Sequence, residues 1–245
     1  GGDRRARHDG GGVGRGRGAV LGVRTLYNTS IGKKVVMAVT GIVLYAYVIV
    51  HMLANLKIFG GMAGGINEYA VFLREVGAPV FSHEQLLWLA RVVLLASVGL
   101  HIVAAVQVTQ QDIASRPVGY AKKNPVVSTF AGRTMRWGGI FIFLFIIFHI
   151  LHFTTGTFLP GYRELEPYHN VTAGFANPLV AAFYIAAMVA LGLHLYHGIW
   201  SMSQTLGWRT RANDGFWRGL ASLSALAIAG GFIVVPLGVL LGIVR

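Results

Sequence analysis

Five apolar runs, each long enough to cross a lipid bilayer, constrain the fold of this chain more than any other feature. A spanning helix needs roughly 20 apolar residues, because a helix rises about 1.5 Å per residue and the hydrocarbon core is about 30 Å thick. Only 12% of the residues are charged, about half the share found in soluble domains. We therefore predict an all-α integral membrane bundle of five helices, with spans at about residues 35–58, 86–108, 137–159, 178–203 and 216–244.

Three shorter segments lie outside these runs. Residues 1–18 are almost entirely Gly, Arg, Asp and His, which predicts a disordered basic tail before a single membrane domain at 19–245. Asn67 to Val76 has the apolar spacing of a short amphipathic helix between the first two spans. Ser82 followed by Gln85 is typical of a capping box at the start of the second span.

Lysine and arginine are concentrated in alternate loops. They are dense before the first span, between the second and third, and between the fourth and fifth, whereas the other two loops hold few. Because cytoplasmic loops are the basic ones, we expect the N-terminus to be cytoplasmic and the C-terminus outside. This pattern also accounts for the net charge of +12 without a nucleic-acid partner, since the basic residues flank membrane spans.

Histidines inside the spans indicate the chemistry. An imidazole in hydrocarbon costs free energy unless it has a partner, so each is a functional hypothesis. For any single one, packing against a neighbouring carbonyl is the ordinary alternative, but four helices carrying histidine favour a shared cofactor. The chain has no cysteine, which excludes iron–sulfur ligation and thioether-attached haem. The histidines within spans are His51, His101, His149, His152, His194 and His197.

Counting residues along the spans sorts four of these histidines into two levels. At about 1.5 Å per residue, His51 and His149 lie about 24 and 18 Å from the inner surface, and His101 and His194 lie about 10 and 14 Å from it. Two histidines that face each other across a bundle can bind one haem iron from both sides. We therefore predict two b-type haems, the outer one bound by His51 and His149 and the inner one by His101 and His194.

Spacing alone does not choose the ligand within the third and fourth spans. His149 and His152 are three residues apart and share a helix face, and so do His194 and His197. His152 and His197 therefore stay open as second choices. Glycines at 41, 99, 138, 139, 192 and 198 are compatible with close packing around a large flat cofactor, or equally with ordinary helix packing.

Four stretches resemble the single-chain, two-haem cytochrome b subunit of succinate dehydrogenases and fumarate reductases. They are HMLANLKIFGG followed by NEYAVFLRE, the isolated His101, HILHFTTG, and LHLYHGIWSMSQTLGW. The resemblance covers about residues 30–245 and includes the five-span layout. It implies that the first span pairs with the third and the second with the fourth. It also favours His194, four residues before Gly198, and favours His149 in the third span.

The resemblance implies a function and partners. The chain is expected to be the membrane anchor of a succinate:quinone oxidoreductase of a bacterial inner membrane, working in either direction. A flavoprotein and an iron–sulfur subunit would dock on its cytoplasmic face, menaquinone is the expected quinone, and a higher oligomer is compatible with this assignment. Some relatives have a glutamate two residues before the fourth ligand, where this chain has Gly192. Their proton route is therefore not transferred to this chain.

The quinone site is expected near the outer haem. Glu68 is attractive because quinone reduction needs protons and a carboxylate can relay them. Arg91 is unusual inside an apolar helix. The ordinary alternative for Glu68 and Arg74 is a solvated helix surface, and an inner site near Ser201, Gln204 and Trp208 stays open. The outer candidates are Asn55, Glu68, Tyr69, Arg74, Arg91 and His152.

Two other functions compete with this expectation. A two-haem cytochrome b of a hydrogenase or formate dehydrogenase shares the haem argument but not the motif of the fourth span. A transporter that uses histidines as a proton or metal relay predicts acidic residues within the spans and inverted repeats. None of the nine Asp and Glu residues lies deep in a span, and the sequence has no evident inverted repeat.

Overall fold

A computed structural model describes the backbone of residues 27, 29–61, 65–115 and 130–245, and the side chains of the same residues except 130–133. Within these ranges it has seven α-helices and no strand, which confirms the all-α prediction. The predicted tail at 1–18 lies outside the described residues, and so do the basic residues 116, 122 and 123 of the loop between the second and third spans.

Five helices are long and apolar enough to cross a membrane, which confirms the five predicted spans. The second runs farther than predicted because its polar last turns continue the helix beyond the apolar run. The third ends at Thr154, before Gly156 takes up a positive φ of 70°. The helices are α2 (Ser30–Leu56, followed by a 3-10 turn Lys57–Gly60), α4 (Gln85–Ala114), α5 (Phe130–His149, followed by a π-helix Ile150–Thr154), α7 (Pro178–Thr205) and α8 (Asp214–Leu240).

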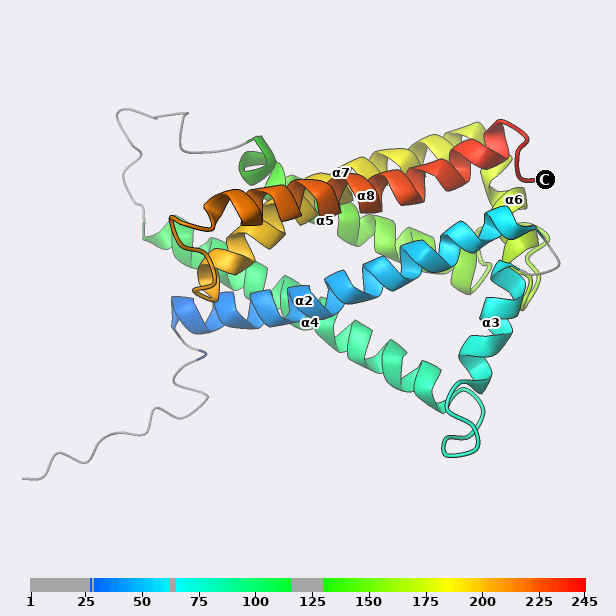
Figure 1. Ribbon diagram of the computed structural model, residues 1–245, viewed down its shortest axis with the longest axis horizontal. Helices are drawn as coiled ribbons and strands as arrows, with labels where there is room; N and C mark the ends of the chain where they lie inside the picture. The colour runs from blue at the N-terminus through cyan, green and yellow to red at the C-terminus, as the bar shows by residue number, and fades with distance from the viewer. Residues whose placement is uncertain (1–26, 28, 62–64, 116–129) are drawn as a thin grey trace, which may run out of the picture.

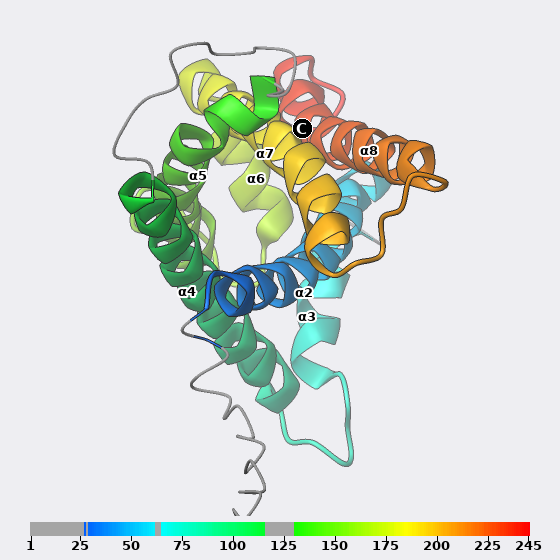
Figure 2. The ribbon, with the colours of Figure 1, turned by 90° about the vertical axis from the view of Figure 1, so that its left-hand side faces the viewer.

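The long helices form two packed groups (Figures 1 and 2). α2 packs along α4, while α7 packs against both α5 and α8, and α8 also touches α2. Figure 2 looks along the bundle and shows α2, α4, α5 and α7 around a common centre, with α8 outside them. In this view α2 and α4 therefore lie opposite α5 and α7.

Two short helices lie at one end of the bundle. The predicted amphipathic helix is confirmed as α3 (Ile66–Glu75). Sequence analysis missed α6 (Pro167–Phe175), whose start is marked by a proline in its first turn. The Asn67 side-chain oxygen accepts a hydrogen bond of 2.9 Å from the Tyr168 backbone N–H, which joins α3 to α6. α6 also packs on α7 and α8, so it covers this end of the bundle.

The start of α4 differs from the predicted capping box. The Gln85 side chain accepts a hydrogen bond of 2.9 Å from the Ser82 backbone N–H, as a capping box requires. The residue before the helix is Glu84, however, which has a positive φ of 64° and caps nothing with its side chain. The prediction that Ser82 caps α4 was therefore wrong, because the chain makes one more turn before the helix begins.

The opposite end of the bundle is fixed by a charged cluster in the loop between α7 and α8. Asp214 forms ion pairs with Arg209 at 3.2 Å and with Arg218 at 2.7 Å. Both guanidinium groups also lie over the Trp200 ring, 4.4 and 5.4 Å from its centroid. These two basic residues therefore hold the loop in place, besides contributing to the positive charge of this end.

Gly174 of α6 is expected to resist substitution. A Cβ at this position would lie 2.8 Å from Phe153 Cε1 and 2.9 Å from His152 Cε1. Gly174→Ala is therefore expected to destabilise the protein by about 1–3 kcal/mol through overpacking, even though alanine favours helix by about 1 kcal/mol. Thermal unfolding in detergent measures the effect. Gly219→Ala in α8 is the control, because, apart from adjacent residues and nearby backbone of its own helix, no described atom lies within 4 Å of its Cβ position. An equal Tm for the two variants would contradict the expectation.

Candidate functional site

The structure brings His51 of α2 next to His149 of α5. Their ring centroids are 5.8 Å apart and the ring planes are inclined by 76°. Tyr47 stacks on His51 at 5.3 Å from one side, and Phe232 of α8 lies at 5.7 Å. Phe145 stacks on His149 at 5.7 Å. Aromatic neighbours thus hold both imidazoles of this outer pair in fixed directions.

His101 of α4 lies next to His194 of α7, with ring centroids 6.2 Å apart. The His101 Nδ1 atom is 3.1 Å from the Met37 carbonyl oxygen and 3.2 Å from the Thr40 hydroxyl. A carbonyl only accepts, so Nδ1 carries the proton and donates it to Met37. This hydrogen bond leaves the lone pair of His101 on Nε2, where a metal ligand needs it.

The two histidine pairs stand at different levels of the bundle. The His101 ring lies against Gly41 of α2, where a Cβ would be 3.5 Å from His101 Cε1. His51 lies ten residues farther along the same helix, which is about 15 Å. The inner pair, His101 and His194, and the outer pair, His51 and His149, are therefore separated along the bundle. Each pair joins one helix of the group α2 and α4 to one helix of the group α5 and α7.

The spacing within each pair fits one metal ion between two imidazoles. Two rings that bind one ion from opposite sides, each through a bond of about 2 Å, have centroids roughly 6 Å apart. Among the described residues, no three His, Asp or Glu side chains converge. A zinc or non-haem iron site needs three or more protein ligands, whereas the iron of a haem needs only two axial ones.

Two further observations agree with a flat group between the helices. The four paired histidines are only partly buried, although the two rings of each pair lie next to each other between long helices. The His194 Nδ1 atom is enclosed and has no hydrogen-bond partner in the described part of the chain. Buried polar atoms without partners are uncommon and are typical of functional positions. The residues present therefore fit a haem, and their role as ligands stays a prediction.

The alternative histidines point elsewhere. His152 is only 2% exposed, and its Nδ1 atom lies 3.0 Å from the Tyr184 hydroxyl. His197 has Trp200 as its ring neighbour, at 6.2 Å. Neither of them pairs with His51 or His101.

The glycines have several roles rather than one. Gly41 gives room to His101, whereas Gly192 packs on α8, where its Cβ would be 3.2 Å from Ala229 Cβ. A glutamate at position 192 would therefore press against Ala229 of α8. The predicted close packing does not extend to every glycine. Apart from adjacent residues and nearby backbone of the same helix, no described atom lies within 4 Å of the Cβ positions of Gly99, Gly138, Gly139 and Gly198.

Two of the quinone candidates, Arg74 and Arg91, line one pocket of about 430 Å³ at the end that carries α3 and α6. Arg74 forms an ion pair of 2.8 Å with Glu84. The Arg91 guanidinium lies over the Trp88 ring, 4.7 Å from its centroid, and forms no ion pair with a described carboxylate. The full lining is Arg74, Glu84, Trp88, Arg91, Thr154, Tyr162 and Glu164.

The other outer candidates lie apart from this pocket. The Asn55 amide donates to the His51 backbone carbonyl at 2.7 Å. Tyr69 lies beside Phe72, with ring centroids 6.1 Å apart, and Glu68 is exposed. His152 is buried beneath α6. The predicted set therefore divides: two arginines share a pocket, and the remaining four do not line it.

The inner candidates do not line the pocket that Arg74 and Arg91 share. Trp208 stacks on Trp217 at 5.9 Å, and Gln204 is exposed on the last turn of α7. Ser201 is partly buried, and its carbonyl accepts a hydrogen bond of 3.1 Å from Thr205.

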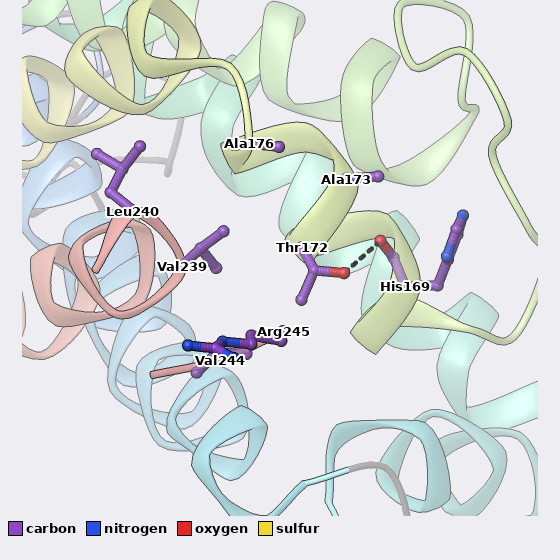
Figure 3. Close-up of a pocket in the computed structure, with 8 residues that line it drawn as sticks. All are labelled: His169, Thr172, Ala173, Ala176, Val239, Leu240, Val244 and Arg245. Atoms are coloured by element: carbon purple, nitrogen blue, oxygen red, sulfur yellow. Dashed lines mark hydrogen bonds between the residues drawn. The ribbon is translucent and has the colours of Figure 1, made fainter. Parts of the chain in front are cut away.

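A second groove, of about 450 Å³, lies between α6 and the end of α8 (Figure 3). The Thr172 hydroxyl beside it donates to the His169 carbonyl at 2.9 Å and is thus already engaged. None of the predicted site residues lines this groove, whose walls are His169, Thr172, Ala173, Ala176, Val239, Leu240, Val244 and Arg245.

Sequence analysis missed several residues of these sites. Tyr184 in α7 contacts both His149 and His152 through its hydroxyl, and a hydroxyl within an apolar span is the same kind of signal as an imidazole there. Glu84, Trp88, Tyr162 and Glu164 reach the pocket from loops or helix ends whose paths the sequence does not reveal.

Comparison of the chain with protein-family models, curated proteins and solved structures found no match. The features of the chain that point to a function are therefore the paired histidines and the sequence motifs around them.

Proposed function

We propose that this protein is the membrane anchor and cytochrome b subunit of a succinate:quinone oxidoreductase, with two b-type haems between its first four spans. One observation carries the proposal: four different helices present two histidine pairs, with ring centroids 5.8 and 6.2 Å apart. The four sequence stretches that resemble such subunits support this function over that of another two-haem cytochrome b.

The histidines have defined roles in this proposal. His51 and His149 hold the outer haem, and His101 and His194 hold the inner one. A haem bound in this way accepts and donates one electron at its iron. The Met37 carbonyl orients the His101 imidazole, because a donated Nδ1–H fixes both the tautomer and the ring direction. The aromatic rings of Tyr47 and Phe145 orient the outer pair.

The levels of the two pairs define an electron path along the bundle. An iron–sulfur subunit on the cytoplasmic face would exchange electrons with the inner haem, with a flavoprotein beyond it. The outer haem lies about 15 Å farther along α2, toward the end with α3 and α6. This orientation rests on the lysines and arginines, which are dense before the first span and in the loops after the second and fourth spans. Since cytoplasmic loops are the basic ones, the N-terminus lies in the cytoplasm of a bacterial cell in this proposal.

The pocket that Arg74 and Arg91 share is the proposed quinone site. Its volume of about 430 Å³ lies within the usual range for small-molecule pockets. The Arg91 guanidinium is free of ion pairs with described carboxylates, so it can donate hydrogen bonds to a quinone carbonyl oxygen. The Glu84 and Glu164 carboxylates line the same pocket and can deliver the protons that quinone reduction consumes. Menaquinone is the proposed substrate.

The visible absorption spectrum of the purified full-length protein tests this function. We expect the bands of a reduced b-type haem after addition of dithionite, with two haems per chain by pyridine haemochrome assay. Copurification of a flavoprotein and an iron–sulfur protein would identify the succinate-linked complex, whereas copurification of a hydrogenase or formate dehydrogenase would favour the alternative cytochrome. A colourless, fully folded preparation would contradict both and favour a histidine-based transporter.

A further inference from the structure

We infer that Tyr184 is the positioning residue of the outer pair, with His152 as its hydrogen-bond partner. The Tyr184 hydroxyl lies 3.0 Å from His152 Nδ1 and 3.4 Å from His149 Nδ1, so one oxygen bridges two imidazoles of the same helix turn. This inference rests on the proposed function, because it takes His149 rather than His152 as the axial ligand.

The chemistry of the three groups gives the chain of hydrogen bonds a direction. A His149 that binds iron through Nε2 carries its proton on Nδ1, which therefore donates to the Tyr184 oxygen. The Tyr184 hydroxyl has a single proton, which it donates to the lone pair of His152 Nδ1. The direction from His149 through Tyr184 to His152 satisfies all three polar atoms with both histidines neutral.

Packing keeps Tyr184 in this position. Its side chain is 6% exposed, and the rings of Phe145 and Phe175 contact it edge-on with centroids 5.0 and 4.9 Å away. His152 is 2% exposed and is covered by Phe153, whose ring centroid is 4.1 Å from its own. Neither side chain can turn away without opening the aromatic core, so the hydrogen bond to His149 is built into the fold.

The inner pair lacks such a relay. There the backbone carbonyl of Met37 accepts from His101, and His194 Nδ1 has no partner among the described residues. A change at Tyr184 therefore acts on one pair alone, and the inner haem provides an internal reference in the same sample.

Removal of the hydroxyl is expected to raise the midpoint potential of the outer haem. A donated Nδ1–H makes the imidazole more basic, which stabilises the oxidised and more positive iron. In Tyr184→Phe this hydrogen bond is absent, so the reduced state becomes relatively more favourable. Loss of the hydrogen-bond partner of a metal-binding histidine also weakens metal binding by roughly 10–100-fold. The outer haem of Tyr184→Phe should therefore transfer to apomyoglobin faster than that of the unaltered protein.

The experiment is a redox titration of the full-length protein in lipid nanodiscs, followed by visible absorption. In Tyr184→Phe we expect a higher potential for one haem and an unchanged potential for the other. Tyr45→Phe is the control, because it removes a hydroxyl contact of 2.7 Å with Ser224 of α8, whereas the hydroxyl of Tyr184 contacts His149 and His152. Two bound haems with unaltered potentials in Tyr184→Phe would overturn the inference, whereas absence of haem from the unaltered protein would overturn the proposed function instead.

Variants of His152 test the far end of the relay. His152→Asn keeps an acceptor oxygen close to the position of Nδ1, so its outer potential should stay near that of the unaltered protein. His152→Leu removes the acceptor and should shift the potential in the same direction as Tyr184→Phe. If His152→Leu loses the outer haem while His149→Leu keeps it, His152 is the ligand and the inference is wrong.

Discussion

Replacement of either His101 or His194 by alanine is expected to remove one haem of two, and the same haem in both variants. The two imidazoles have ring centroids 6.2 Å apart and come from α4 and α7, so in the proposed function each would supply one ligand to the same haem. With one imidazole gone, a haem in this position has a single protein ligand. The haem content should fall from two per chain to one, which the pyridine haemochrome assay measures directly.

The identity of the lost haem is determined by redox titration. His101→Ala and His194→Ala should each leave the same single potential, and His51→Ala and His149→Ala should leave the other. His197→Ala is the matched control in α7, because His197 lies beside Trp200 and away from His101. It should keep both haems. Loss of different haems from His101→Ala and His194→Ala would show that the pairing is wrong.

Substitution of Arg91 by glutamine is expected to raise the KM for the quinone by roughly 10–100-fold, the equivalent of one hydrogen bond from a charged donor. Arg91 is the better choice of the two arginines, since Arg74 is already held by Glu84 at 2.8 Å. The measurement is succinate:quinone reductase activity of the assembled complex with a soluble menaquinone analogue. The haem content should not change, because Arg91 contacts neither histidine pair.

Arg163→Gln provides the control for a charge on the same end of the bundle. Arg163 pairs with Glu166 at 3.1 Å and does not line the pocket, so its replacement should leave the KM unaltered. An unchanged KM in Arg91→Gln would place quinone chemistry elsewhere, and equivalent variants of Gln204 and Trp208 would then test the inner alternative.

The spans could be predicted because they depend on composition and length alone. Their ends were less certain: the third helix stops at Thr154, where the chain turns through Gly156, and the second continues through polar residues to Ala114. The short helix α6 was missed because its nine residues carry no long apolar run, and five of them are buried where α6 packs on neighbouring elements such as α7 and α8.

Which histidines contact each other could be predicted from their depth in the membrane, because the rise per residue of a helix converts residue number into height. The rise does not give the rotation of each helix about its axis, so it could not separate His149 from His152. In the structure His149 lies beside His51, whereas Tyr184 and α6 enclose His152. The quinone site was predicted less well, because the paths of the loops decide which polar side chains come together. Arg74 and Arg91 belong to different helices yet line one pocket.

The division of the helices into two groups has a consequence for biogenesis. Each histidine pair crosses from the α2–α4 group to the α5–α7 group, while α4 owes its main protein contacts to α2 and α3. Insertion of all five helices can therefore precede closure of the seam between the groups. If the proposed haems bind in that seam, each of them would link the two groups of helices through one histidine from each group.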